Sequence, residues 1–524
     1  MIGPTASRLW MSIALLLPAA AFAQAVPKAT CGKGDRPESG LQGETTQAEV
    51  SSGANKTGFK CNADLVGQVQ GEGASWQLAA WKNCAYYDQA NGSTKPVQPG
   101  TVVVDVSDPA HPVITDHLVD PSGAMIDPWE SLKVNVQRQL LGGAQQPGPG
   151  FAIYDISGDC RHPVLKSSVV LSGSKGHAGQ WAPDGKTYYI TTITNNPSVV
   201  AVDTTDVSNP KVFFTWTPPA GTDPIFHDLE FSKDGNTAYM TIIGGFGSQP
   251  GSTNGLLTLD VSDIQSRKAN PTIRIISTLT WDDGSVIAQN ALPVTIKGKP
   301  YILFTDELGP NLEGAGAAQA ACASGKSVNG FPRLIDISDP VHPAVVSKLQ
   351  LEMSDVAHCS QSLAAIATTG NTPFGPGNPI FGYSCHYCNV DDADDATMAA
   401  CSCFSAGMRF FDIRDPKSPK EVAYYKPPAQ GTKSLPGSQY WGFAGAGFDH
   451  PVDWAPAKPS FPKDRGMTSG DVWFTTQDNG FQVAKVNVNL RSGSGCSSVG
   501  GAGAAALLGL LAFLRKRRAA RRAG

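Results

Sequence analysis

A short phrase built around Asp-Pro recurs along the chain and constrains its fold more than any other feature. Each copy follows a short run of strand-forming residues, and most copies lead into a second such run. Asp-Pro starts a tight turn, because proline presets φ and the aspartate carboxylate can bond the backbone two residues on. A second proline cannot donate to a ladder, so the strand that it begins is expected at a sheet edge. The copies, some of them imperfect, begin at Asp105, Asp155, Asp203, Asp260, Asp336 and Asp412.

Six such units, spaced by tens of residues, indicate a repeat architecture. In the first unit, a hairpin of residues 75–81 and 84–87 precedes the phrase and its two strands. Four strands per unit is the blade of a β-propeller. A degenerate unit over 450–487 lacks the Asp-Pro turn, which fits a last blade closed by a strand from near residue 65. The sequence therefore predicts an all-β fold, a β-propeller of seven four-stranded blades, with six or eight blades as the alternatives.

The order of strand, Asp-Val-Ser-Asp-Pro-x-x-Pro and strand resembles the LVIVD repeat of bacterial surface-protein propellers. The resemblance spans about residues 64–490. It implies the propeller fold and is poor evidence of activity. The two longest units carry insertions at 309–330 and 370–406. Such insertions are expected in loops on one face of a propeller, often the face that binds.

The N-terminal end differs from the repeat region. Residues 1–23 contain Arg8, a short apolar core and the small-residue pattern Ala-Phe-Ala, which together predict a secretory signal peptide. A membrane helix is a weaker interpretation, because the apolar run is too short to span a bilayer. Residues 24–63 are polar and rich in glycine, and they predict an extended leader before the propeller at 64–490.

The C-terminal tail, residues 491–524, places Cys496 in a Gly/Ser-rich linker, then an apolar run and an arginine-rich end. This three-part order resembles the myxobacterial C-terminal sorting signal. The resemblance implies processing near Cys496, with lipid attachment there, and display at the cell surface or outer membrane. A plain anchor with an intact C-terminal transmembrane helix also fits the positive-inside rule. In either case, the tail makes the membrane a partner of an exported protein.

The charge of the region between the two ends excludes one class of partner. Once Arg8 and the six basic residues after Leu514 are set aside, 34 Lys and Arg remain against 45 Asp and Glu, a net charge of −11. A surface of this sign argues against nucleic acid as a ligand.

Ten of the 11 cysteines lie between the two ends, and Cys496 is the odd one. An even number in an exported chain predicts disulfides, although their pairing cannot be deduced from the sequence. Cys385, Cys388, Cys401 and Cys403 form a CxxC and a CxC close together. This group predicts either two disulfides, which the exported location favours, or a zinc site.

Histidines recur at the same place in several units. His177 and His227 each lie eight residues before the glycine of an Asp-Gly turn, and Asn290 lies eight residues before Gly298. Such turns fit hairpins that join the innermost strand to the next, so these residues are expected at the mouth of the central channel. His358 and His450 open the sixth and seventh units in a less regular register.

Two interpretations of these histidines remain open. In the first, the rings cap strand ends through N–H bonds, a feature that all repeated units would inherit. In the second, the histidines form a funnel that binds a transition metal, because neutral imidazole suits Cu, Zn, Fe and Ni. Metal affinity would then fall below about pH 6.5, where free imidazole takes up a proton. The register is distantly similar to that of selenium-binding proteins, and this resemblance implies a propeller with a histidine-bound metal.

No nucleophile elbow, Walker loop, dinucleotide fingerprint or HExxH sequence occurs in the chain. The first prediction is therefore a surface-anchored propeller that binds a surface protein, a glycan or a small ligand without catalysis. The alternative is a metal-dependent oxidoreductase. Its predicted metal ligands are His177, His227, His358 and His450.

Overall fold

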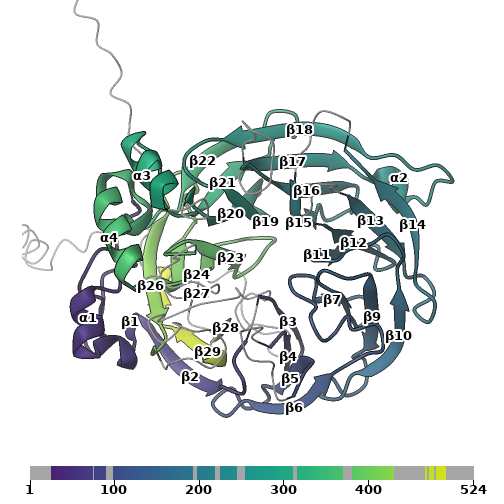
Figure 1. Cartoon of the computed structure of the whole chain (residues 1–524), viewed down its shortest axis with the longest axis horizontal. Helices are drawn as coiled ribbons and strands as arrows, with labels where there is room; N and C mark the ends of the chain where they lie inside the picture. The colour runs from purple at the N-terminus through teal and green to yellow at the C-terminus, as the bar shows by residue number, and fades with distance from the viewer. Residues whose placement is uncertain are drawn as a thin grey trace, which may run out of the picture.

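A computed structural model confirms the predicted architecture, a nearly all-β propeller with seven blades around one axis (Figure 1). Adjacent strands within each blade are antiparallel, and the innermost strands surround the central channel. The structure describes residues 25–74, 76–89, 98–192, 198–218, 225–244, 254–310, 315–369, 381–429, 467–468, 471–476 and 479–490.

Blades one to five are each built from four consecutive strands, numbered from the channel outward. Blade one comprises β3 (Leu78–Trp81), β4 (Cys84–Tyr87), β5 (Thr101–Asp105) and β6 (Val113–Leu118). Blade two comprises β7 (Lys133–Asn135), β8 (Leu140–Ala144), β9 (Gly150–Asp155) and β10 (Val164–Val170). Blade three comprises β11 (Ala178–Trp181), β12 (Thr187–Thr191), β13 (Val199–Asp203) and β14 (Lys211–Trp216).

Blade four comprises β15 (Ile225–Phe231), β16 (Thr237–Ile243), β17 (Asn254–Asp260) and β18 (Arg274–Trp281), with the short helix α2 (Ser262–Gln265) in its outer turn. Blade five comprises β19 (Ile287–Ile296), β20 (Lys299–Leu308), β21 (Pro332–Asp336) and β22 (Ala344–Lys348). Blade six comprises β23 (Cys385–Val390), β24 (Met398–Cys403), β25 (Gly407–Asp412) and β26 (Lys420–Lys426).

The seventh blade joins the two ends of the described chain. Its described strands are β28 (Asp471–Thr476), β29 (Gly480–Val486) and, outermost, β2 (Ala63–Val69). Leu65 lies opposite Ala484, so the predicted closing strand is confirmed. Beside it, β27 (Met467–Thr468) pairs with β30 (Val488–Asn489). Because the last blade takes its outer strand from the start of the chain, the ring is closed by strand pairing.

The recurring phrase forms the turn between the third and fourth strands of its blade. In blade one, Oδ1 of Asp105 accepts hydrogen bonds from the backbone N–H of Ser107 at 2.9 Å and from its hydroxyl at 2.6 Å. Asp155 binds Ser157 in the same way in blade two. In blades one to five, the strand after the turn is the outermost strand of the blade, as the prolines predict. In blade six, only a strand of the leader lies outside it.

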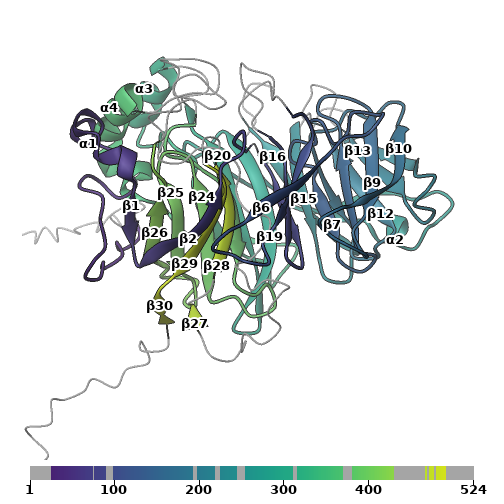
Figure 2. The same cartoon turned by 90° about the horizontal axis from the view of Figure 1, so that it is seen from below.

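The leader packs on blade six. Its strand β1 (Phe59–Cys61) pairs with β26 and adds a fifth strand to that blade. It also contains α1 (Gln47–Ser52) and the 3-10 helix η1 (Ala54–Thr57). Figure 2 shows α1 on the same side of the ring as α3 (Ala315–Ala323) and α4 (Cys359–Thr369), two helices from the long fifth and sixth units. Between them run the 3-10 helices η3 (Glu352–Ser354) and η4 (Val356–His358).

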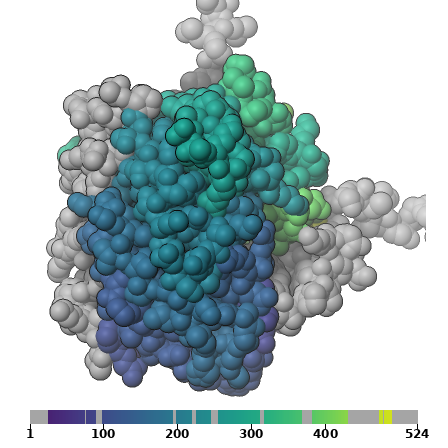
Figure 3. Space-filling view, turned by 90° about the vertical axis from the view of Figure 1, so that its right-hand side faces the viewer, coloured from purple at the N-terminus to yellow at the C-terminus, as the bar shows by residue number. Residues whose placement is uncertain are grey.

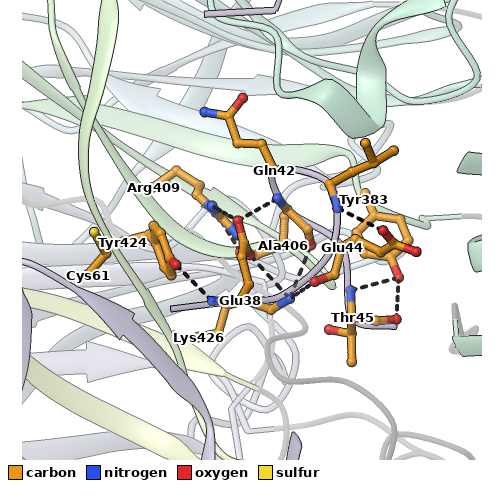
Figure 4. A network of polar contacts seen from close by, with 12 residues as sticks. Glu38, Gln42, Glu44, Thr45, Cys61, Tyr383, Ala406, Arg409, Tyr424 and Lys426 are labelled. Atoms are coloured by element: carbon orange, nitrogen blue, oxygen red, sulfur yellow. Dashed lines mark hydrogen bonds and ion pairs between the residues drawn. The ribbon is translucent and has the colours of Figure 1, made fainter. Parts of the chain in front are cut away.

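Ion pairs and backbone contacts fix the leader to the blade. Both oxygens of Glu38 bind the guanidinium of Arg409, at 3.0 and 2.7 Å, and Glu421 binds the same group at 2.9 Å. The ammonium group of Lys426 donates to the carbonyl oxygens of Gly43 and Glu44 (Figure 4). The leader is therefore an integral part of the folded domain.

Apolar side chains fill the spaces between neighbouring blades. Between blades two and three, for example, Trp181 and Phe151 pack against Tyr188 at ring-centroid distances of 5.0 and 4.9 Å. The wall formed by successive blades is continuous in the space-filling view (Figure 3).

Ten cysteines of the described chain pair into five disulfides, which is consistent with an exported protein. Cys385 is bonded to Cys403 and Cys388 to Cys401, so these four cysteines are not available as zinc ligands. The other pairs are Cys31–Cys61, Cys84–Cys160 and Cys322–Cys359. Within the described ranges, no helix is both long and apolar enough to cross a membrane. The predicted signal peptide at 1–23 and the tail at 491–524 lie outside the described residues.

Candidate metal centre

Polar side chains from successive blades meet inside the channel, around which β7, β11, β15, β19 and β23 are arranged (Figure 1). Three of these inner strands carry β-bulges at a similar depth. In blade four the pair His227 and Asp228 is bulged, and in blade six the pair His386 and Tyr387. In blade five the register shifts around Gln289. Since a bulge re-aims side chains, these residues turn towards the channel from a strand that otherwise alternates between two faces.

The most compact group consists of Glu130, His177 and His227, which come from the starts of blades two, three and four. The two histidine Nε2 atoms lie 3.1 Å apart. Oε2 of Glu130 lies 3.2 Å from Nε2 of His177 and 3.3 Å from Nε2 of His227. All three side chains are buried. Three potential ligand atoms therefore converge on one point.

The second oxygen of Glu130 is held by two further residues. Oε1 accepts a hydrogen bond from Nε2 of Gln289 at 2.9 Å and lies 2.8 Å from Nε2 of His386. Glu307 approaches the same imidazole nitrogen at 3.5 Å. Groups that bind a ligating carboxylate orient it and leave its other oxygen for the metal. His386 and Gln289 are placed to do this for Glu130.

A second polar layer accompanies the first, built from the neighbours of the bulged residues. Oδ2 of Asp228 accepts hydrogen bonds from the amide of Asn290 at 3.1 Å and from the hydroxyl of Tyr387 at 3.2 Å. The ammonium group of Lys133 lies 5.6 Å from the centre of the Tyr387 ring. The bulges thus supply both layers at once, one residue of each pair to each layer.

Burial decides the charge states in this cluster. It lowers the pKa of the His227 imidazole to about 3, so the lone pair of this side chain stays available far below pH 6.5. Burial raises the pKa of Glu130, but His227 and the other imidazoles outweigh this effect and bring that pKa well below its usual value. Burial and the charge of Glu130 raise the pKa of Glu307, which favours its neutral form.

Aromatic rings surround the histidines. Trp76 lies 5.0 Å from Trp129 and 5.5 Å from His386, measured between ring centroids, and Trp129 lies 5.9 Å from His177. Phe404 contacts His386 at 5.6 Å. These apolar walls lower the local dielectric, so a charge at this point interacts more strongly with Glu130 than it would in water.

The three ligand atoms fit a transition metal. A tetrahedral ion with bonds of about 2.0 to 2.1 Å keeps its ligand atoms about 3.3 to 3.4 Å apart, and the three separations here are 3.1, 3.2 and 3.3 Å. Oε2 of Glu130 accepts no hydrogen bond within the described part of the chain, although it is buried. A cation between Glu130, His177 and His227 satisfies this oxygen.

The structure brings together two of the four histidines predicted as ligands, His177 and His227. His358 lies in η4, next to the disulfide of Cys359, because residues 356–369 form helices instead of an inner strand. Its assignment to the channel is therefore wrong, and His386 is the histidine of blade six that reaches it. His450 and the predicted processing residue Cys496 lie outside the described residues.

Sequence reasoning missed Glu130 and His386, although a usable signal was present. Each lies eight residues before a position in the turn between the first two strands of its blade, Arg138 and Asp394 respectively. This is the spacing of His177 and His227 from their turns. Neither turn carries the Asp-Gly pair that marks this register in blades three and four, so the spacing alone is a weak signal.

A family model supports the repeat, whereas the curated proteins include no match to this chain. The LVIVD repeat model matches residues 97–117, which include the first phrase.

Solved structures are similar only at low identity. A selenium-binding protein from Sulfolobus tokodaii, described as hypothetical, has 13% identity and a TM-score of 0.43, covering 65% of this chain and 73% of its own. The periplasmic gluconolactonase of Pseudomonas aeruginosa has 12% identity and a TM-score of 0.42, covering 66% and 84%. The WD40 domain of Toxoplasma gondii coronin has 10% identity and a TM-score of 0.45, covering 86% and 88%. No function is drawn from similarities this low.

Proposed function

We propose that this protein is an exported metalloenzyme whose central channel holds one divalent transition metal ion through Glu130, His177 and His227. The observation that carries the proposal is Oε2 of Glu130, a buried oxygen without a hydrogen bond in the described residues, flanked by two imidazole nitrogens at ligand spacing. A buried charge costs much free energy unless it is paired. A metal ion at this point compensates Glu130 and uses both histidine lone pairs.

The ligand set supports a catalytic centre better than a structural one. Structural zinc sites take four protein ligands, whereas catalytic sites keep three and leave a position for water or substrate. Two histidines and one carboxylate with open positions are also the set of non-haem Fe(II) oxygenases. Of the two functions predicted from the sequence, the geometry therefore supports the metal-dependent oxidoreductase over the non-catalytic binding protein. When bound, the metal supplies Lewis-acid or redox chemistry, and His386 and Gln289 orient the ligand Glu130.

Metal content and affinity test the proposal. The exported protein should carry about one transition metal ion per chain, measured by mass spectrometry of the elements. His177→Ala and His227→Ala should each lose this ion, because each removes one of three ligands. His111→Ala and His342→Ala are matched controls, since both side chains are more than four-fifths exposed in outer turns. A metal-free wild-type protein, or unchanged loading of the channel variants, contradicts the proposal.

The metal that the protein carries as isolated tests the reaction class. Iron or copper supports the assignment as an oxidoreductase. Zinc alone contradicts that assignment but still supports a metal-binding site. A protein without metal returns the function to the first prediction, a propeller that binds a surface protein, a glycan or a small ligand.

Surface display is the second part of the proposal. It is supported by the order of Cys496, apolar run and basic end in the tail, and by the five disulfides. Processing near Cys496, with lipid attachment there, should leave mature surface protein without any peptide from 515–524. Peptide mass spectrometry of surface-extracted protein checks this. An intact C-terminus on mature protein would instead favour the anchored helix.

A further inference from the structure

His386 and Tyr387 lie between two disulfides that join the same two strands. Cys385 is paired with Cys403, and Cys388 with Cys401, both in the strand register and by a sulfur–sulfur bond. Two residues of β23 therefore face the single intervening residue of β24. The result is a bulge closed at both ends by covalent bonds, which we call the disulfide clamp.

The clamp carries residues of both polar layers of the channel. Nε2 of His386 reaches Oε1 of Glu130, a residue 256 positions away in sequence. The hydroxyl of Tyr387 reaches Asp228 in the second layer. Both contacts cross the channel to other blades, so the bulge of blade six positions groups in blades two and four.

The equivalent bulge of blade four is held by a different device. There the hydroxyl of Thr241 accepts a hydrogen bond from the backbone N–H of Asp228 at 2.9 Å and lies 3.2 Å from its carbonyl oxygen. No disulfide spans that bulge. Two cysteine pairs at one bulge are therefore a feature of blade six alone among the described strands. One of the two residues between them, His386, binds Glu130.

The position of the His386 ring depends strongly on the backbone. Its Nδ1 has no hydrogen-bond partner in the described residues, so Nε2 makes the polar contacts of the ring. The remaining contacts are with aromatic rings such as Trp76 and Phe404, at 5.5 and 5.6 Å. Such contacts tolerate small displacements, whereas the hydrogen bond to Glu130 does not. Fixing the backbone on both sides of His386 is thus the main way to fix its orientation.

We propose that the disulfide clamp is a positioning device for the metal centre, acting through His386 on the ligand Glu130. This inference rests on the proposed function, since it assigns the clamp a role at the same site. Its cysteines touch neither metal nor substrate in this scheme. They set how well Glu130 presents its free oxygen to the metal.

Paired alanine variants test the clamp without leaving free thiols. Cys385→Ala/Cys403→Ala and Cys388→Ala/Cys401→Ala remove one disulfide each. Loss of a group that orients a metal ligand costs about 10- to 100-fold in metal affinity, and each variant should fall in this range. The matched control is Cys84→Ala/Cys160→Ala, which removes a disulfide between blades one and two, away from the channel. Its affinity should equal that of the wild type, although its thermal stability falls as well.

A second background separates positioning from general stability. In His386→Ala, removing either clamp disulfide should cost no further metal affinity, because the residue through which the clamp acts is absent. An equal loss with and without His386, or an equal loss in the control, overturns the proposal.

Chemical labelling gives a readout that needs no metal. His386 is fully buried, so diethylpyrocarbonate should not modify it in the wild type or the control. In folded clamp variants, loss of the fixed bulge should displace the ring from Glu130 and expose it to the reagent, as peptide mass spectrometry detects. If the wild type binds no metal, the proposed function fails, and labelling alone decides the clamp. Protection of His386 in both clamp variants contradicts the inference.

Discussion

Two clusters of charged side chains are buried in this propeller, one beneath the leader and one in the channel, and they are balanced differently. Beneath the leader, Arg409 binds both oxygens of Glu38 and one of Glu421, so a guanidinium group meets two carboxyl groups. In the channel, Glu130 contacts imidazoles and an amide, and one of its oxygens accepts no hydrogen bond from the described residues. The leader cluster is complete without a ligand, whereas the channel cluster is not.

The contrast separates buried charges that hold the fold together from those that can hold a ligand. A complete ion-pair network resists the removal of any member, because the partner left behind is buried and unpaired. An incomplete network gains from a bound cation and tolerates neutralisation. Variants of the two clusters should therefore respond differently to loss of a charge.

The largest effect is expected from acid in the channel. The His227 pKa is about 3 in the folded protein, against about 6.5 for an unfolded histidine, so between these pH values the unfolded state binds a proton that the folded state does not. The free energy of unfolding of the metal-free protein should therefore fall as pH drops from 6.5 towards 3, by up to about 4 to 5 kcal/mol from this residue.

Urea unfolding at pH 7 and pH 4 checks this dependence. His227→Gln should flatten it, because glutamine does not titrate. His342→Gln, altered in an exposed turn, should keep the wild-type dependence. Parallel profiles for wild type and His227→Gln would refute the assignment of the effect to this imidazole.

Next in size is Arg409→Ala, which breaks the complete cluster. It leaves Glu421 buried without its cation and Glu38 with only Lys426, at 3.7 Å. The free energy of unfolding should therefore fall by about 3 to 5 kcal/mol. Arg274→Ala is the matched control, because Arg274 is half-exposed and pairs with Asp260 on an outer turn. That change should leave the free energy of unfolding close to the wild-type value, because exposed ion pairs contribute little. Similar losses in the two variants would contradict the assignment of the cluster beneath the leader as a structural ion-pair network.

Glu130→Gln should separate the two clusters most clearly. Metal affinity should fall at least about 100-fold, more than loss of an orienting group alone, because a charged ligand is replaced by a neutral one. The metal-free protein should not lose stability as Arg409→Ala does, since the buried charge is neutralised instead of orphaned. Calorimetric titration and chemical unfolding measure the two quantities. A large loss of metal-free stability would place Glu130 among the structural charges.

The smallest effect is expected at Gln289, one of the two groups on Oε1 of Glu130. Gln289→Leu should weaken metal binding about tenfold, the lower end of the range for a group that orients a ligand. Competition with a chelator resolves a difference of this size. Unchanged affinity would mean that His386 alone holds that oxygen.

Parts of the channel site were predictable because they follow local turn chemistry. His177 and His227 were found by their distance from Asp-Gly turns, which fix where an inner strand begins. His358 was misplaced because its segment forms helices, and helix and strand starts look alike when only a short motif is read. His386 stood in the cysteine-rich stretch that was interpreted as a disulfide or zinc loop. The sequence does not state that this stretch is an inner strand with a bulge.

The repeat, the blades, the turns with their aspartates and the closing strand near Leu65 could all be predicted from the amino-acid sequence. Each of these depends on residues that are close in sequence. The determinants are the preset φ angles of proline, side-chain bonds to nearby backbone, and the alternation of apolar and polar residues along a strand. The disulfide pairing and the contact of Glu130 with His386 across the channel depend instead on the tertiary fold. That meeting requires a closed ring and bulges of the right depth in several blades. The physical reason is that inner strands converge at the propeller axis, which brings residues far apart in sequence into contact. Their buried charges then either pair with one another or need a bound cation.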